Sequence, residues 1–246
     1  MLELLARQRL AVEPQVEVLL GVSARAARDR LAHLAAGGYL RRERIFTGQP
    51  GCARITRKGL DAIGSRLPPP RLDLACYQHD VGLTWLWLAA RDGTFGALGD
   101  VVSEREMRSH DARPGRERPP FGVGIGSVGT GGRERLHYPD LMLWTANGKR
   151  VAVELELTTK SRRRLEGIML GYAGDQRIDA VLYLVPARDP GLADRIEQAA
   201  ARYGIADLVH VQLLAGPPEG APDHGRTLGR RQGRGRQSGW PGEATA

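Results

Sequence analysis

The chain has 246 residues, 41% of them hydrophobic, which predicts one large domain or two modest ones with a sizeable core. It contains only two cysteines, Cys52 and Cys76, which excludes a disulfide framework and favours a reducing, cytoplasmic location. The sequence has no N-terminal signal segment and no apolar run of membrane-spanning length, so we expect a soluble protein with no membrane partner.

The net charge of +8 is concentrated at the two ends of the chain. Residues 1–66 carry twelve basic and six acidic side chains, and residues 225–246 carry five arginines and one glutamate. The segment between them is nearly balanced, with nineteen basic and twenty-one acidic groups. A clustered excess of positive charge indicates a polyanionic partner, and nucleic acid before a membrane surface.

Two consecutive helices are predicted near the N-terminus. Pro14 opens a short helix that a glycine turn ends, and Ser23 is the N-cap of a second helix over residues 24–36. One face of the second helix is apolar, whereas Arg25 and Arg28 lie near its start on or beside the outer face. Small residues on the outer face would let this helix lie in a major groove, where both arginines reach bases or phosphates.

A basic hairpin follows, with strands over 39–45 and 53–55, and a last helix over 58–67 capped by Thr56. Helix, turn, helix and basic hairpin are typical of a winged helix-turn-helix, which we expect at 1–67 with double-stranded DNA as its partner. The alternative is a helical module that makes protein contacts. The expected DNA-binding residues are Arg25, Arg28, Arg41, Arg42, Arg44 and Arg54.

Three prolines at 68–70 predict a stiff linker over residues 68–71 and the clearest domain boundary. A helix that places Trp85 and Trp87 in the core is expected next. The elements expected in this part are the helix at 72–91, a strand within 95–107 that bears Glu104 and Glu106, and a mobile loop at 111–133.

Residues 138–160 hold the most informative pattern in the chain. They read as two strands joined by a turn at Asn147-Gly148, and strand alternation places Glu154 and Glu156 on one face. Asp140 falls on the same face of the neighbouring strand, with Lys160 just beyond. Three carboxylates and one amine suit Mg²⁺ or Mn²⁺ and a phosphate substrate. Alternatively, both glutamates form the solvated face of a half-exposed strand.

The remaining pattern alternates helices and strands. Ser161 or Thr159 is expected to cap a helix over 162–173, and the apolar run at 180–185 predicts a strand buried on both faces. A helix over 192–203 and a strand over 208–214 complete an α/β fold with a mixed central sheet and helices on both of its faces. The basic segment 215–246 is expected to be a disordered tail that contacts polyanions.

The order Pro139-Asp140, Glu154-x-Glu156 and Lys160 resembles the PD-(D/E)xK nuclease superfamily, although Glu156 stands where that superfamily usually has its lysine. Up to about residue 214 the chain resembles the replication-relaxation family of bacterial mobile-element proteins. The resemblance implies a winged helix-turn-helix at 1–67 and a restriction-endonuclease-like α/β domain at 72–214. The segments that carry it are 103–106, 138–140, 154–161 and Tyr172.

Two functions remain open under this resemblance, both in the replication, relaxation or transfer of a plasmid or integrated element. If the second domain is active, Asp140 and Glu154 ligate the metal, Glu156 or Glu104 assists, and Lys160 serves the phosphate or the attacking water. If it is inactive, the protein is a regulator without a cofactor, whose second domain forms a homodimer or binds replication or transfer proteins of the element. A nucleotide-binding ATPase is disfavoured, because the sequence lacks a phosphate-loop motif.

Overall fold

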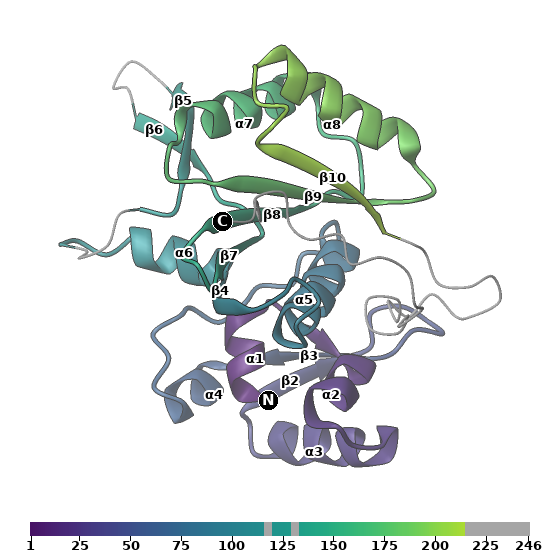
Figure 1. Ribbon diagram of the computed structural model, residues 1–246. Coiled ribbons are helices and arrows are strands. Elements are labelled where there is room, and N and C mark those ends of the chain that lie inside the picture. The colour runs from purple at the N-terminus through teal and green to yellow at the C-terminus, as the bar shows by residue number, and fades with distance from the viewer. Residues whose placement is uncertain (116–119, 129–132, 215–246) are drawn as a thin grey trace.

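The computed structural model describes residues 1–115, 120–128 and 133–214. An N-terminal segment, a central sheet and a pair of covering helices follow one another as layers (Figure 1). The expected basic tail at 215–246 lies outside the described residues. Within the described ranges, no helix combines the length and the apolar character needed to cross a membrane.

The two predicted N-terminal helices are present. Helix α2 (Glu13–Leu20) ends at Gly21, whose φ of 61° is the left-handed conformation that glycine adopts without strain. Helix α3 (Ala24–Ala36) begins after Ser23, whose side chain accepts the backbone N–H of Ala26. A three-stranded antiparallel sheet of order β1-β3-β2 completes the segment. Its other elements are α1 (Leu2–Arg7), β1 (Ala11–Val12), β2 (Leu40–Glu43), β3 (Cys52–Ile55) and α4 (Arg57–Ala62).

The central sheet has five strands in the order β10-β9-β8-β7-β4. Strand β9 runs parallel to β8 and β10, whereas β7 is antiparallel to β8 and β4, so the sheet is mixed as predicted. The predicted turn joins β7 to β8, with Gly148 at a φ of 82°. The strands are β4 (Leu98–Ser103), β7 (Leu141–Thr145), β8 (Arg150–Leu155), β9 (Ala180–Pro186) and β10 (Val209–Leu214).

Because side chains alternate along these strands, the two faces of the sheet contribute to two separate hydrophobic cores. Leu143 and Val153 belong to the core shared with α5 (Tyr77–Arg91), which includes Trp85 and Trp87 as expected. On the opposite face, Met142 and other strand residues pack with α7 (Arg162–Gly174) and α8 (Pro190–Arg202). Helices therefore cover both faces of the sheet, as predicted.

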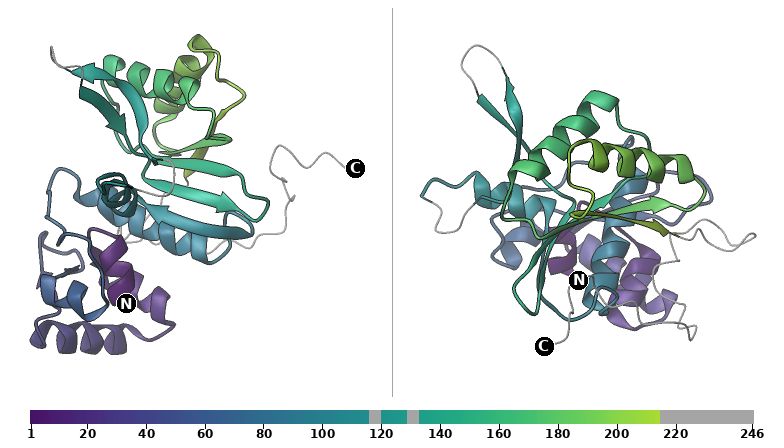
Figure 2. Two further views of the ribbon diagram at one scale, coloured as in Figure 1. Left: turned by 90° about the vertical axis from the view of Figure 1, so that its left-hand side faces the viewer. Right: turned by 45° about the horizontal axis from the view of Figure 1, so that its top comes forward.

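Helix α5 lies between the N-terminal segment and the sheet (Figure 2). One continuous core extends from α1 through α5 to the sheet, across the proline linker. Buried hydrogen bonds reinforce this contact: Gln15 Nε2 donates to the carbonyl of Val81 at 2.7 Å, and Thr84 Oγ1 donates to that of Leu10 at 2.7 Å. The N-terminal segment is therefore packed firmly against the rest of the chain.

Two sequence predictions in this part are wrong. Strand β4 ends at Ser103, because Ser103 and Glu106 form a capping box that starts α6 (Glu104–Asp111). Glu104 therefore lies in the first turn of a helix and not on a strand. The glycine-rich stretch expected as a mobile loop contains a hairpin of β5 (Val123–Val128) and β6 (Arg133–His137), which packs on α7. Residues 116–119 and 129–132 lie outside the described ranges.

Helix α7 approaches this hairpin closely at Gly171. A Cβ atom at Gly171 would lie 2.8 Å from the carbonyl oxygen of Gly124 and 2.9 Å from Val123 Cγ1. We predict that Gly171→Ala lowers the free energy of unfolding by about 1–3 kcal/mol through overpacking. Gly167→Ala, one turn earlier with no atom within 4 Å of its added Cβ, should raise it by up to about 1 kcal/mol. Denaturant unfolding of both variants tests the close approach, and equal effects would contradict it.

Candidate functional site

The predicted acidic residues meet where β7 begins and β8 ends. Asp140 directly precedes β7, Glu154 lies near the end of β8, and Glu156 directly follows β8. Glu154 and Glu156 are 2% and 5% exposed. They do not form a solvated face, so that alternative is wrong.

Glu154 is held by two donors on the α7 side of the sheet. Its Oε1 accepts hydrogen bonds from His137 Nε2 at 2.5 Å and from Tyr172 Oη at 2.5 Å. Burial alone would raise the pKa of Glu154, but the charge and hydrogen bond of His137, the charge of Lys160 and the Tyr172 hydroxyl together hold it below its ordinary value. Glu154 is therefore a buried anion at neutral pH.

Asp140 is directed differently from the prediction. Its Oδ2 accepts the backbone N–H of Leu155 at 2.8 Å and lies 3.2 Å from His79 Nε2 on α5, on the other side of the sheet from Tyr172. The carbonyl of Leu155 lies 3.0 Å from the same histidine nitrogen. Both neighbours are acceptors, so His79 Nε2 carries a proton. Burial lowers the pKa of His79, but Asp140 and Asp80 more than offset this and raise it.

Lys160 links the two sides of the site electrostatically. Its Nζ donates to Glu156 Oε2, and its charge is also attracted by Glu154 and Asp140. Burial nevertheless lowers the pKa of Lys160, with a further contribution from Arg164. The structure thus brings Lys160 near all three predicted strand carboxylates.

Glu104 belongs to a neighbouring crevice that it lines together with Asp80 and Asp140. Its carboxylate accepts from Arg9 at 2.9 Å and from Arg108 at 2.7 Å. Burial would raise the pKa of Glu104, but these two arginines lower it. Burial raises the pKa of Asp80 to about 6, although Arg9 lies 3.6 Å away.

Two features bear on whether these residues fit a metal ion. Within the described ranges, no group of three or more His, Cys, Asp or Glu side chains is arranged to hold one. Asp140 and Glu154, however, each accept their hydrogen bonds from the described residues on a single carboxylate oxygen, Oδ2 and Oε1 respectively. Because Mg²⁺ is commonly bound by one or two carboxylates with water and substrate phosphate, the donor chemistry of each carboxylate fits it, while partners on opposite sides of the sheet orient the two.

The predicted DNA-binding arginines fall into two groups. Helix α3 lies on the outer side of the N-terminal segment, away from the sheet (Figure 1), and Arg25 on it is 91% exposed. Arg28 is 57% exposed and donates to Glu13. The β2 and loop arginines Arg41, Arg42 and Arg44 are also exposed.

Arg54 differs from the other predicted DNA-binding arginines. Its side chain is only 13% exposed, and it donates to Glu43 at 2.5 Å and to the carbonyl of Pro70 at 3.3 Å. Arg54 therefore holds the linker against β2 and β3 and is much less accessible than the others.

Sequence analysis missed several residues of the site. His137 ends a strand that was not predicted, and Asp80 on α5 is far in the chain from Arg9, which lies between α1 and β1. Tyr172 was included only through the family resemblance, and His79, which contacts Asp140 in the structure, was not among the predicted site residues. Comparison of the chain with family models, curated proteins and solved structures found no match.

The raised pKa of Asp80 predicts a pH-dependent penalty on stability. The group titrates near 3.8 ordinarily and at about 6 in the fold, so ionising it between these values costs the folded state about 3 kcal/mol. Below pH 3.8 Asp80 is protonated in both states and the penalty is absent. As the pH rises through about 6, the folded protein loses this amount of stability. Asp80→Asn should therefore gain stability relative to the wild type over this window, measured by thermal unfolding. A pH-independent difference would contradict the assignment.

Proposed function

We propose that the protein binds double-stranded DNA through α3 and the β2–β3 hairpin, as a winged helix-turn-helix at residues 1–67. The exposed arginines of α3 are the single observation that carries this proposal. Arg25 and Arg28 lie in the first two turns of an outward-facing helix whose remaining outer positions include the small residues Ala32 and Ala36. Such a surface allows close approach to a major groove and supplies donors for phosphates and base edges.

The hairpin beside α3 supports the same proposal. Arg41 and Arg42 of β2 and Arg44 in the following loop are exposed and form no ion pair among the described residues. The family resemblance, carried by the motifs at 138–140 and 154–161, supports a role in a plasmid or an integrated mobile element. Replication, relaxation and transfer of such an element all require DNA binding.

We predict that the double variant Arg25→Ala, Arg28→Ala weakens duplex binding by about 2–5 kcal/mol. The slope of log affinity against log salt should become shallower by about 0.9 for each phosphate that the variant no longer neutralises. Fluorescence anisotropy of the full chain with labelled duplex DNA measures both quantities.

Arg188→Ala is the matched control, because Arg188 is an exposed arginine in the loop between β9 and α8, in the layer opposite α3. It should change neither quantity. Equal decreases in affinity for the control and for the double variant would contradict recognition through α3.

A second candidate function is metal-dependent cleavage of DNA by a nuclease-like domain. It is favoured by the grouping of Asp140, Glu154 and Lys160, in which each carboxylate accepts hydrogen bonds from the described residues on only one of its oxygens. A bound Mg²⁺ or Mn²⁺ would be held by these two carboxylates and would supply charge stabilisation at the scissile phosphate.

The remaining residues would support that chemistry in different ways. Tyr172 and His137 orient Glu154 and keep it ionised, and His79 orients Asp140. Lys160, with its lowered pKa, donates to the phosphate oxygens and stabilises the charge that develops there. Glu156 holds Lys160 in place, and Glu104 lies one crevice away, where its arginine partners neutralise it.

Incubation with supercoiled plasmid and Mg²⁺ or Mn²⁺ tests this candidate. We predict cleavage by the wild type, and a loss of at least about a hundredfold in both Asp140→Asn and Lys160→Ala, as is found when a group that stabilises transition-state charge is removed. The ion should also raise the melting temperature of the wild type and of Lys160→Ala, but not that of Asp140→Asn.

Asp194→Asn and Lys149→Ala change exposed residues of the same types and should retain full activity. Absence of both cleavage and a metal response in the wild type would leave the alternative proposal. In that case the protein is a DNA-binding regulator whose α/β part forms a homodimer or binds mobile-element proteins.

A further inference from the structure

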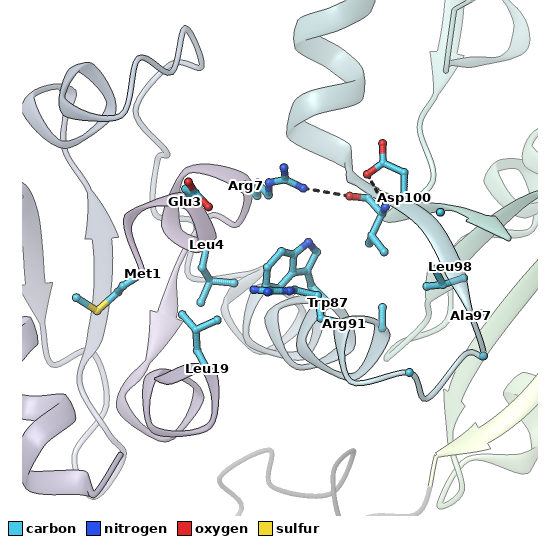
Figure 3. A pocket seen from close by; sticks show the side chains of 15 residues that line it. Met1, Glu3, Leu4, Arg7, Leu19, Trp87, Arg91, Ala97, Leu98 and Asp100 are labelled. Atoms are coloured by element: carbon cyan, nitrogen blue, oxygen red, sulfur yellow. Dashed lines mark hydrogen bonds between the residues drawn. The ribbon is translucent and has the colours of Figure 1, made fainter. Parts of the chain in front are cut away.

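A second cavity, separate from the carboxylates, opens between α1, the C-terminal end of α5 and β4 (Figure 3). Its volume is about 560 Å³, within the range of small-molecule sites. Apolar side chains of Leu4, Leu19 and Leu98 contribute to its lining. The cavity therefore joins the N-terminal segment to the α/β part of the chain at a place that the proposed functions do not use.

Trp87 contributes to the wall of this cavity, and its indole nitrogen is buried within that wall. The residue is 5% exposed, and its indole Nε1 has no hydrogen-bond partner among the described residues. Figure 3 shows this nitrogen on the side of the ring that faces Arg7. The indole therefore senses the cavity from within its wall, and the donors that can reach a ligand come from the side chains beside it.

Two cations flank the indole. The guanidinium of Arg91 lies over the Trp87 ring, 5.0 Å from its centroid, and forms no ion pair with any described residue. Arg7 makes only long contacts, 3.3 Å to the carbonyl of Val101 and 3.4 Å to Glu106. Both guanidinium groups therefore retain donors for an anion.

The acidic residues of the lining do not cancel these cations. Glu3 is exposed, and Asp100 is also exposed and accepts the backbone N–H of Val101 at 2.8 Å. The lining thus contains these two exposed carboxylates together with the guanidinium donors of Arg7 and Arg91.

We propose that this cavity binds a small organic anion with an apolar body. Its carboxylate or phosphate accepts from Arg7 and Arg91, and its apolar part packs on Leu4, Leu19 and Leu98 beside the Trp87 ring. Such a ligand bridges α1 to α5 and β4. The site is independent of DNA binding and of the carboxylate cluster, so it stands or fails separately from the proposed function.

The test uses the indole N–H signals of the full-length protein in two-dimensional ¹H–¹⁵N NMR. The chain has four tryptophans, and Trp87→Phe identifies the signal of Trp87. The probes are 2-naphthoate, 2-naphthyl phosphate and the neutral isostere 2-naphthamide. We expect saturable movement of the Trp87 signal with at least one anion and none with the amide, and the two anions distinguish a carboxylate site from a phosphate site.

Variants that remove one charge test where the anion binds and control for a folding defect. Arg91→Gln changes an exposed side chain and should weaken anion binding about tenfold, the effect of losing one charge-assisted hydrogen bond. Arg188→Gln, an exposed arginine outside the cavity, should bind as the wild type does. A Trp87 signal that neither anion moves at millimolar concentration, an equal response to the amide, or unchanged affinity in Arg91→Gln would overturn the proposal.

Discussion

The burial of helix α5 is the constraint on which the rest of the structure depends. Eleven of its fifteen residues are buried, because the helix packs against the N-terminal segment on one side and against the sheet on the other. A helix that is apolar on nearly all sides is stable only when it is enclosed in this way. Its N-terminal end carries His79 and Asp80 to the carboxylate cluster, and its C-terminal end carries Trp87 and Arg91 to the second cavity.

Charged groups fix the orientation of the layers around α5. Arg105 is buried, and it donates to the carbonyls of Gln8 and Pro68, which ties α6 to the N-terminal segment and to the linker. Burial, reinforced by repulsion from Arg9, lowers the pKa of Arg105 to about 10. Since burying a charge costs more than its pairing returns in many proteins, we infer that these hydrogen bonds specify the arrangement and contribute little to stability.

Local features of the fold were predictable from the sequence, and contacts between distant residues were not. Ser23 and the Asn147-Gly148 turn act through neighbouring backbone groups, so their residue types were sufficient evidence. Glu104 was expected on the strand because it follows the apolar residues around Val101. The capping box at Ser103, which ends the strand and begins α6, is the sequence signal against that prediction. Strand β5 was missed because its glycines have low strand propensity, and its pairing with β6 and packing on α7 stabilise it.

In the candidate site too, local features were predictable and contacts between distant residues were not. Alternation along β8 correctly placed Glu154 on one face, together with Ala152. The direction of Asp140 could not be predicted, because it depends on His79, which is 61 residues away in sequence and lies on a helix packed against the other face. A carboxylate at the end of a strand is oriented by its partners and not by the strand period.

The continuous core across the proline linker has a consequence for how the protein is organised as a folding unit. Removing residues 1–67 would expose the apolar surface of α5 that Leu4, Leu10 and Val16 now cover, and would deprive Arg105 of the carbonyl of Gln8. We therefore expect unfolding of either part to destabilise the other, so that the chain melts cooperatively and not domain by domain. Although its sequence reads as two consecutive modules, we expect that neither part is stable when it is separated from the other.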